Sequence, residues 1–313
     1  MIRVILRKLG STAVVVVVVA VIVFLLIHLS PGDPAAIIAG DRATSADIEH
    51  IRQSLGLDQP LIVQFGLWVG RLLHGDLGIS LFSRMPVGTL VAARIEPTLS
   101  LAIATMLFAV VTALPLGILA AWQVGRWIDR AIMVLAIVAF SFPIFIIGYG
   151  LVWGFALHWR LLPVQGYASI ANGFWPYLLH LILPAVSLGL VFMALLTRMT
   201  RSTMIEVLGE DYIRTARAKG LGQLAILLRH ALKNAAVPIV TTIGSGIALL
   251  IGGVVVTESV FSIPGIGRLT IDAVTQRDYP VIQGVILISS FAYVLVNFMI
   301  DLSYRLFDPR IQG

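Results

Sequence analysis

Cysteine, charge and the common nucleotide motifs are the features that this sequence of 313 residues lacks or has little of. It contains no cysteine, which excludes disulfide bonds and thiolate metal sites. Only 12% of its residues are charged, against roughly 25% in soluble globular domains. Hydrophobic residues make up 58% of the chain. These proportions indicate a membrane protein rather than one or two soluble domains.

The sequence motifs of nucleotide and zinc chemistry are also missing. The phosphate-binding loop GxxxxGK[ST] is excluded because no glycine is followed by lysine, and HExxH does not occur. The histidines are scattered singly, and His28 and His180, near span ends, are interpreted as interfacial side chains. We therefore predict no catalytic residue, no metal site and no cofactor bound by this chain.

The formal net charge of +6 would suggest a nucleic-acid partner in a soluble protein. Here the cations flank long apolar runs, and no basic stripe is interleaved with aromatic residues. Anionic inner-leaflet lipids and the cytoplasmic bias of Lys and Arg explain the charge more simply. We expect contact with membrane lipid and none with nucleic acid.

Six apolar runs are long enough to cross a hydrocarbon core of about 30 Å as helices. The first follows Arg3, Arg7 and Lys8 as in a signal peptide, but it is too long and has no cleavage site, so it predicts an anchored span. Backbone groups in lipid must be paired internally, so we predict an all-α membrane protein with six transmembrane helices. The runs are Leu9–Leu29, Thr98–Ala121, Ala131–Leu157, Tyr177–Thr197, Ala236–Thr257 and Val281–Ser303.

The connecting segments differ in charge. One set carries 14 of the 22 Lys and Arg residues and has a net charge of +8 when Asp301 is included, whereas the other set has −2. The positive-inside rule assigns the first set to the cytoplasm, together with both termini. The cytoplasmic segments are then 1–8, 122–130, 198–235 and 304–313, and the external ones are 30–97, 158–176 and 258–280.

This topology suggests three parts. Residues 1–97 form the first span and an external helical region, and residues 98–303 form a five-span core with a cytoplasmic coupling region at 198–235. Residues 304–313 form a cytoplasmic tail.

The external segment 30–97 contains signals for two amphipathic helices. Thr44 and Asp47 have the spacing of a capping box, and Gly56 stands at a stop position. Pro60 begins the second helix and Gly75 ends it. Its apolar residues recur at helical spacing: Leu61, Phe65, Trp68 and Leu72. The two helices either lie on the outer leaflet as caps of the bundle or form a docking platform for an external partner.

Several predicted spans are interrupted. Pro115, Pro143 and Pro184 lie inside the second, third and fourth, where proline frees carbonyls and kinks helices. The fifth contains glycines that allow close helix approach: Gly244, Gly246, Gly252 and Gly253. Candidate pathway residues are polar or aromatic groups near kinks and span ends: Ser141, Phe142, Glu258 and Asn297. No ionisable relay crosses the membrane centre, so uphill transport would draw its energy from another subunit.

The cytoplasmic stretch EDYIRTARAKGLGQLAILLRHALKNA spans residues 210–235 and carries five cations. Glu210 and Asp211 suit the start of a short helix, and Arg217 and Lys219 suit its end before Gly220. A second helix follows, with Arg229 and Lys233 outside an apolar stripe of Leu224, Leu227, Leu228, Ala231 and Leu232. The stretch is either a positive-inside loop on the inner leaflet or a helix presented to a cytoplasmic partner.

DYIRTARAKGL followed by RHALKNAAVP resembles the cytoplasmic signature of ABC-importer permeases of the dipeptide, oligopeptide and nickel type. The resemblance covers nearly the whole chain. Further segments agree in order: HLSPGDPA, LGLDQPL, GDLGIS, ESVFSIPGIGRL, RDYPVIQG and LFDPRI. The general importer motif E-A-A-x-x-x-G is degenerate here, because Arg214 stands where the acidic residue would be. No role of that acid is therefore carried over.

The resemblance implies a type I importer fold in a bacterial inner membrane, with a helical external insertion between spans one and two. It implies a second homologous permease, two ATPase subunits that bind ATP and Mg, and an extracytoplasmic binding protein. The chain would be a non-catalytic subunit. Relatives of this type carry peptides, glutathione-like peptides, nickel chelates, opines or sugars, and the sequence does not choose among them.

The resemblance also assigns site residues. A coupling helix would seat in a groove of the ATPase, where the small residues Ala216 and Gly220 would allow close approach. Its residues are Glu210, Asp211, Tyr212, Arg214, Thr215, Ala216, Arg217, Ala218, Lys219 and Gly220. On the external side, we expect Trp68 and Arg268 to contact the binding protein.

Two other classes of protein stay open on the residues alone. A secondary transporter or channel would need an ionisable residue at membrane depth. A membrane-embedded enzyme would need a catalytic pair or a metal cluster facing a cavity. Neither feature stands out in the sequence.

Overall fold

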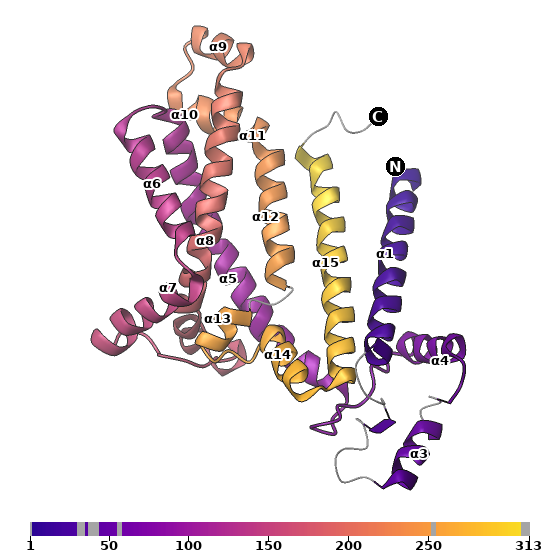
Figure 1. Cartoon of the computed structure of the whole chain (residues 1–313). Coiled ribbons are helices and arrows are strands. Elements are labelled where there is room, and N and C mark those ends of the chain that lie inside the picture. The colour runs from indigo at the N-terminus through magenta and orange to yellow at the C-terminus, as the bar shows by residue number, and fades with distance from the viewer. Residues whose placement is uncertain (1, 30–34, 37–43, 55–57, 252–254, 308–313) are drawn as a thin grey trace. The chain divides into compact units, whose positions relative to one another are not determined.

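The computed structural model describes the chain except for residues 1, 30–34, 37–43, 55–57, 252–254 and 308–313. The described part is built from helices joined by short loops (Figure 1). The helices are α1 (Ile2–Leu29), α3 (Ser45–Ser54), α4 (Leu61–Leu73), α5 (Val87–Trp122), α6 (Trp127–Ser141), α7 (Ile144–Leu151), α8 (Phe174–Leu208), α9 (Asp211–Ala218), α10 (Gln223–Ala225), α11 (Leu232–Asn234), α12 (Ala236–Ile251), α13 (Val255–Val260), α14 (Ile266–Gln276) and α15 (Tyr279–Phe307). Two π-helical turns, Val152–His158 and Ile226–Ala231, and one 3₁₀ turn, Ile170–Asn172, complete them.

The chain divides into two compact units, each described here by itself. Unit 1 comprises residues 1–95 and 269–291, and unit 2 comprises residues 96–268 and 292–313. One division falls between residues 95 and 96, near the predicted boundary at residue 97, and the segment 269–291, which was expected to belong to the five-span core, groups with the N-terminal part.

Three described helices are long and apolar enough to cross a membrane: Val87–Trp122, Phe174–Leu208 and Tyr279–Ile300. Two bent helix pairs raise the number of candidate spans to as many as five within the described residues. The first predicted span lies in α1, where Val14–Leu29 is a shorter apolar helix. The helical membrane architecture is confirmed, whereas the number six stays a prediction.

The third predicted span is not one continuous helix. Helix α6 ends at Ser141, Phe142 is extended with φ −83° and ψ 133°, and α7 begins after Pro143. The segments on the two sides of this break meet at an angle of 98°. Proline excludes the α conformation at the residue before it, which explains why the break falls at Phe142.

The second and fourth spans continue through their prolines. Helix α5 contains Pro97 and Pro115, and α8 contains Pro184. The second span also begins earlier than predicted, because residues 87–97 already belong to α5. Within α8, the hydroxyl of Ser187 donates to the carbonyl of Pro184 at 2.9 Å.

Glycines in α12 permit close helix packing in unit 2. A methyl group at Gly244 would overlap the side chain of Ile300, and one at Gly246 would lie 2.7 Å from the Cε of Met106. This confirms the prediction that glycine in this span serves close approach. Gly252 and Gly253 lie outside the described residues, and α13 follows them at Val255.

The core of unit 2 is rich in small residues. Ala109, Ala113 and Ala194 are fully buried in one cluster, which also contains Ala231 and Ala235. Small side chains let helix backbones approach closely, which favours packing in a membrane where the hydrophobic effect between helices is weak.

Helices form at both positions predicted for the amphipathic helices, as α3 and α4, and their external location stays a prediction. Helix α4 follows Pro60 and ends at Leu73, and Gly75 stands just beyond it with φ +78°. Gly56, the predicted stop of α3, lies outside the described residues. In unit 1, the ring of Phe24 from α1 packs on Phe65 and Trp68 of α4, with centroids 5.3 and 5.7 Å apart.

Candidate functional site

The predicted cytoplasmic helix forms at the position that the sequence indicates. Glu210 is its N-cap with extended backbone, α9 runs from Asp211 to Ala218, and the amide of Lys219 donates to the carbonyl of Thr215 at 3.0 Å. Gly220 follows with φ +77°, a conformation that glycine adopts with little cost. Figure 1 shows α9 at the end of α8, joined to it by a tight turn.

Helix α9 has one buried and one exposed side. Ile213 is fully buried, and Ala216 is 8% exposed. Ile213 belongs to the hydrophobic cluster that includes Met204 of α8 and Ile226 of the following turn. The side chains of Tyr212, Thr215, Ala218 and Lys219 are exposed. The hydrophobic contact therefore fixes the helix on its own core and leaves a polar and cationic face outward.

This arrangement corrects the predicted role of Ala216. We expected its small size to admit a partner, but its side chain packs inside unit 2 and not on the open face. Within this chain a Cβ at Gly220 would have no neighbour within 4 Å, so its expected approach to a partner stays a prediction. Its need for glycine is conformational, set by its positive φ.

The exposed face of α9 is predominantly cationic. Arg214 pairs with Asp211 at 3.1 Å, and both side chains are largely solvent-exposed. The side chains of Arg217 and Lys219 have no ion-pair partner among the described residues. Burial, assisted by nearby Glu210, raises the pKa of the Tyr212 phenol, so it is neutral at physiological pH. The face can thus donate hydrogen bonds and bind acidic groups.

The second part of the stretch departs from the predicted stripe. Leu224 and Leu228 are 69% and 49% exposed, whereas Ile226, Leu227 and Ala231 are buried. The reason is the π-helical turn Ile226–Ala231. In a π-helix each amide donates to the carbonyl five residues earlier, so each turn takes more residues than in an α-helix and the buried positions shift. Arg229 and Lys233 are exposed, as predicted.

An ion pair that the sequence did not predict joins α6 to α8. The guanidinium of Arg201 donates to both oxygens of Asp129, from Nε at 2.5 Å and from a terminal nitrogen at 2.8 Å. The amide of Gly125 donates to the same carboxylate at 2.9 Å, and Asp129 is 3% exposed. A bidentate geometry of this kind fixes orientation as well as distance. The start of α6 is therefore held on α8, two turns before α9.

Glu258 of α13 is enclosed by its own loop. Its carboxylate accepts from the Thr98 hydroxyl at 3.0 Å and from the Arg268 amide at 2.8 Å. The Thr98 oxygen in turn accepts from the amide of Ile266 at 2.8 Å. A methyl group at Gly265 would overlap the carboxylate, so glycine is required there.

Glu258 was predicted to line the pathway, and in this structure its side chain is fully buried. Its contacts instead hold the loop 258–268 against α5. Arg268, a predicted contact for a binding protein, is half-buried, and its backbone belongs to this loop.

The polar side chains among the remaining pathway candidates donate hydrogen bonds to backbone carbonyls of their own helices. The hydroxyl of Ser141 donates to the carbonyl of Ile137 at 2.7 Å, and the amide of Asn297 donates to the carbonyl of Tyr293 at 2.9 Å. Phe142 is 52% exposed at the break after α6. No hydrogen bond among the described residues joins Ser141, Glu258 and Asn297 to one another, so their role in a pathway stays a prediction.

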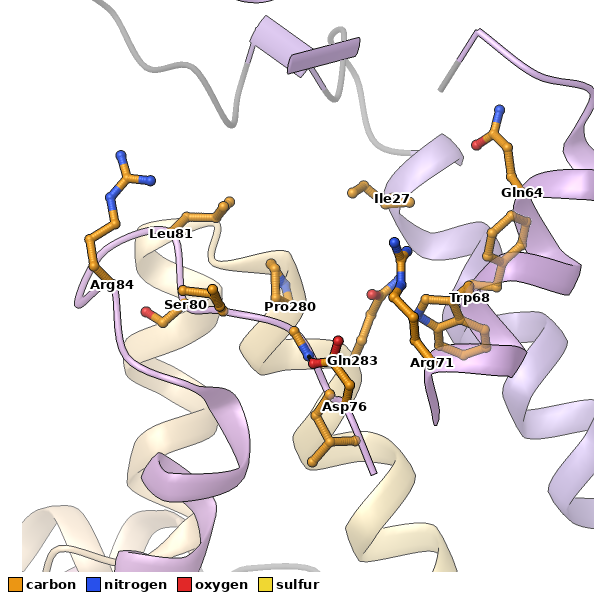
Figure 2. A pocket seen from close by; sticks show the side chains of 14 residues that line it. Ile27, Gln64, Trp68, Arg71, Asp76, Ser80, Leu81, Arg84, Pro280 and Gln283 are labelled. Carbon is orange, nitrogen blue, oxygen red and sulfur yellow. Dashed lines mark hydrogen bonds between the residues drawn. The ribbon is translucent and has the colours of Figure 1, made fainter. Parts of the chain in front are cut away.

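Unit 1 contains a pocket of about 440 Å³, shown in Figure 2. Its walls come from the end of α1, from α4, from residues 76–84 and from the start of α15. Trp68, the other predicted contact for a binding protein, lines this pocket and is half-buried. Within the described residues, no group of three His, Asp or Glu side chains could hold a metal ion.

Comparison with known proteins covers nearly the whole chain. Residues 113–313 match the family described as "Binding-protein-dependent transport system inner membrane component". Residues 1–102 match the family described as "Binding-prot-dependent transport system membrane comp, N-term". The two matches together include α9, the ion pair and the loop around Glu258.

The alignments with curated relatives cover nearly the whole of both chains. The probable peptide ABC transporter permease protein y4tP of Sinorhizobium fredii is 51% identical over 98% of both chains. The dipeptide transport system permease protein DppB of Escherichia coli K12 is 40% identical over 100% of this chain and 99% of its own. The glutathione transport system permease protein GsiC of Escherichia coli O6:H1 is 44% identical over 93% of both.

A solved structure shares the fold. The chain from "Inward facing conformations of the MetNI methionine ABC transporter" aligns with a TM-score of 0.59 at 18% identity. The alignment covers 70% of this chain and 96% of that chain. At this identity the likeness concerns the helical architecture of an importer permease and not its solute.

Proposed function

The chain belongs to the family of inner-membrane components of binding-protein-dependent transport systems, within the peptide-type ABC importer permeases, and from this we propose that it imports a small peptide or peptide-like solute. It would form the membrane pathway together with a second, homologous permease. The relatives are described as permeases for peptides, dipeptides and glutathione, which supports a solute with a peptide backbone.

The proposal includes the other parts of such a system. An extracytoplasmic binding protein would deliver the solute, and two ATPase subunits would bind ATP and Mg on the cytoplasmic side. Both termini and α9 would then lie in the cytoplasm, in keeping with the charge difference between the connecting segments. This chain would carry no catalytic residue.

The observation that carries the proposal is the division of α9 into two faces. Ile213 and Ala216 anchor it on the core, while Tyr212, Thr215, Ala218 and Lys219 stay exposed. An isolated helix of eight residues is too short to be stable by itself, so its packing on unit 2 is what holds it in place. A helix that is anchored on the core and exposed on its other side can transmit the movement of a bound partner to the rest of the unit.

The movement of α9 would reach α6 through α8 and the ion pair between Arg201 and Asp129. Helix α9 continues from α8, and Arg201 of α8 grips Asp129 at the start of α6. Helix α6 leads in turn to the break at Phe142. ATP-driven movement of the ATPases would thus shift α8 and α6 together and act on the bend between α6 and α7.

Copurification tests the proposal directly. The tagged permease, expressed with its partner genes, should retain ATPase subunits, and the purified assembly should hydrolyse ATP faster when the loaded binding protein is added. Retention of no ATPase, together with uptake driven by an ion gradient, would show a secondary transporter instead. Uptake of labelled di- and tripeptides in vesicles then separates peptide solutes from other classes.

A further inference from the structure

The pocket of unit 1 has no part in the coupling just proposed. Phe24 and Ile27 come from the end of α1, Trp68 and Arg71 come from α4, and Gln283 comes from α15. All its lining residues belong to unit 1. The pocket has the size of those that hold small ligands, about 300–1,000 Å³.

A buried carboxylate fixes the loop that forms one wall. Asp278 accepts from the Ser80 hydroxyl at 2.5 Å and from the Leu81 amide at 3.1 Å, and it is 3% exposed. The side-chain amide of Gln283 donates to the carbonyl of Val23 at 3.0 Å, which joins α15 to α1. These bonds link the walls directly, so the cavity is held open by the fold itself.

The charged groups of the pocket are not balanced. Arg71 and Arg84 line it, and neither guanidinium has a hydrogen-bond or ion-pair partner among the described residues. The acid on the wall, Asp76, accepts from the amide of Gly78 at 2.9 Å. Figure 2 shows Arg71 on the α4 side and Arg84 on the loop side. The side chains that line the pocket thus carry an excess of one positive charge, while the carboxylate of Asp278 behind the loop is engaged by Ser80 and Leu81. A guanidinium suits phosphate.

The surroundings of the pocket are those of a membrane interface. It lies at the end of the apolar helix α1 and at the start of α15, and α4 runs across the end of α1 (Figure 1). Helix α4, which lines the pocket with Gln64, Trp68 and Arg71, also exposes large apolar side chains outside the pocket: Ile62 at 79%, Val63 at 42%, Leu67 at 54% and Leu73 at 82%. Interfacial helices combine such an apolar face with Trp and Arg at headgroup level.

We propose that this pocket binds an anionic phospholipid of the outer leaflet. Arg71 contacts the phosphate, and Arg84 adds positive potential on the loop side. Phe24, Ile27 and Trp68 contact the glycerol and the upper acyl chains, which continue along the apolar face of α4. The inference uses the proposed orientation, with this end of α1 outside, and is independent of the solute.

Native mass spectrometry of the complete, delipidated importer tests the site. With phosphatidylglycerol added, Arg71→Gln should retain about fivefold less lipid than the unmodified protein, the effect of one cation near a lipid surface. Arg71→Lys should restore part of the loss, because it keeps the charge but not the planar fork. Arg277→Gln, an exposed arginine of unit 1 outside the pocket, should change nothing.

Four results would overturn the proposal. Diacylglycerol retained as well as phosphatidylglycerol would show an apolar groove without phosphate recognition. Displacement by inorganic phosphate at equal concentration would show an ion site, and displacement by a dipeptide would show a solute site. Equal lipid retention by Arg71→Gln and Arg277→Gln would remove Arg71 from the site. In each case, ATPase copurification and peptide uptake report separately on the proposed transport function.

Discussion

At the scale of the residue, Ala216 and Ala218 show how two small side chains two positions apart on α9 differ in burial. Ala216 is buried against the protein's own core, and Ala218 is exposed. Spacing and residue size alone could not separate them, because the buried side depends on contacts with Met204 and Ile226 from other segments. Gly220→Glu would also be an ambiguous probe, because its positive φ strains any side chain.

The substitution Ala218→Glu should therefore test coupling most cleanly. A glutamate at position 218 would add a bulky side chain to the exposed face and would neutralise part of the positive charge of Arg214, Arg217 and Lys219, with which that face would bind acidic groups of the ATPase. We expect the variant to insert in the membrane normally but to lose the ATPase on pull-down and to stop uptake. Ala225→Glu, at an exposed alanine outside α9, is the matched control and should keep both.

A contrary result is also clear. If Ala218→Glu retains the ATPase and transports as well as Ala225→Glu, α9 is not the contact and the stretch is a positive-inside loop. Ala216→Glu should instead lower expression or thermal stability, since it places a charge in the hydrophobic cluster.

At the scale of the element, local signals were sufficient for some helices and insufficient for others. The helices α3, α4 and α9 were predicted nearly to their ends. For α4 and α9 the signals are local, because Pro60 fits the start of a helix and Gly75 and Gly220 adopt the positive φ that follows a helix end. The π-helical turn Ile226–Ala231 was missed, because the predicted stripe assumed the α-helical period of 3.6 residues and a π-helical turn contains one residue more. The break at Phe142 was signalled only by Pro143, whereas Pro115 and Pro184 leave their helices continuous.

The contact between α6 and α8 could not be predicted from local pattern. Asp129 and Arg201 stand 72 residues apart, and only the packing of the two helices brings them together. The same is true of Glu258, whose position near a span end suggested a pathway until its partners on α5 and in its loop were seen.

Breaking the pair between α6 and α8 should impair transmission. Asp129→Asn or Arg201→Gln leaves a charge without its partner. Because the Arg201 side chain is 27% exposed, the cost should lie below the value of about 3–5 kcal/mol for a fully buried pair. We expect a lower melting temperature and, in assemblies that still form, less solute imported per ATP hydrolysed. Arg130→Gln, an exposed neighbour, should leave this ratio unchanged.

The double exchange Asp129→Arg with Arg201→Asp separates pairing from mere stability. If the ion pair transmits movement, the exchange should recover part of the import per ATP that either single exchange loses. A ratio of solute to ATP that stays normal in Asp129→Asn would show that the pair only stabilises the fold.

At the scale of the whole molecule, topology is the property on which every proposed role depends. The chain has no cysteine, so single introduced cysteines can be labelled without background. Ser45 on α3 and Ser202 on α8 are both exposed. An impermeant maleimide applied from outside should modify Ser45→Cys in intact cells and Ser202→Cys only after lysis. Labelling of both positions in intact cells would reject the orientation, and with it the cytoplasmic place of α9.

The hydrogen bonds around Glu258 join residues that are synthesised at very different times. Thr98 lies 160 residues before Glu258 and 168 before Ile266, yet its hydroxyl bonds to both. Helix α5 therefore leaves the ribosome long before the groups that satisfy this hydroxyl exist. While the intervening helices are being synthesised, water, lipid headgroups or the insertion machinery must accompany Thr98. The Thr98 hydroxyl therefore reaches its native partners only when residue 266 has emerged, although the helix that carries it is among the earlier ones to be made.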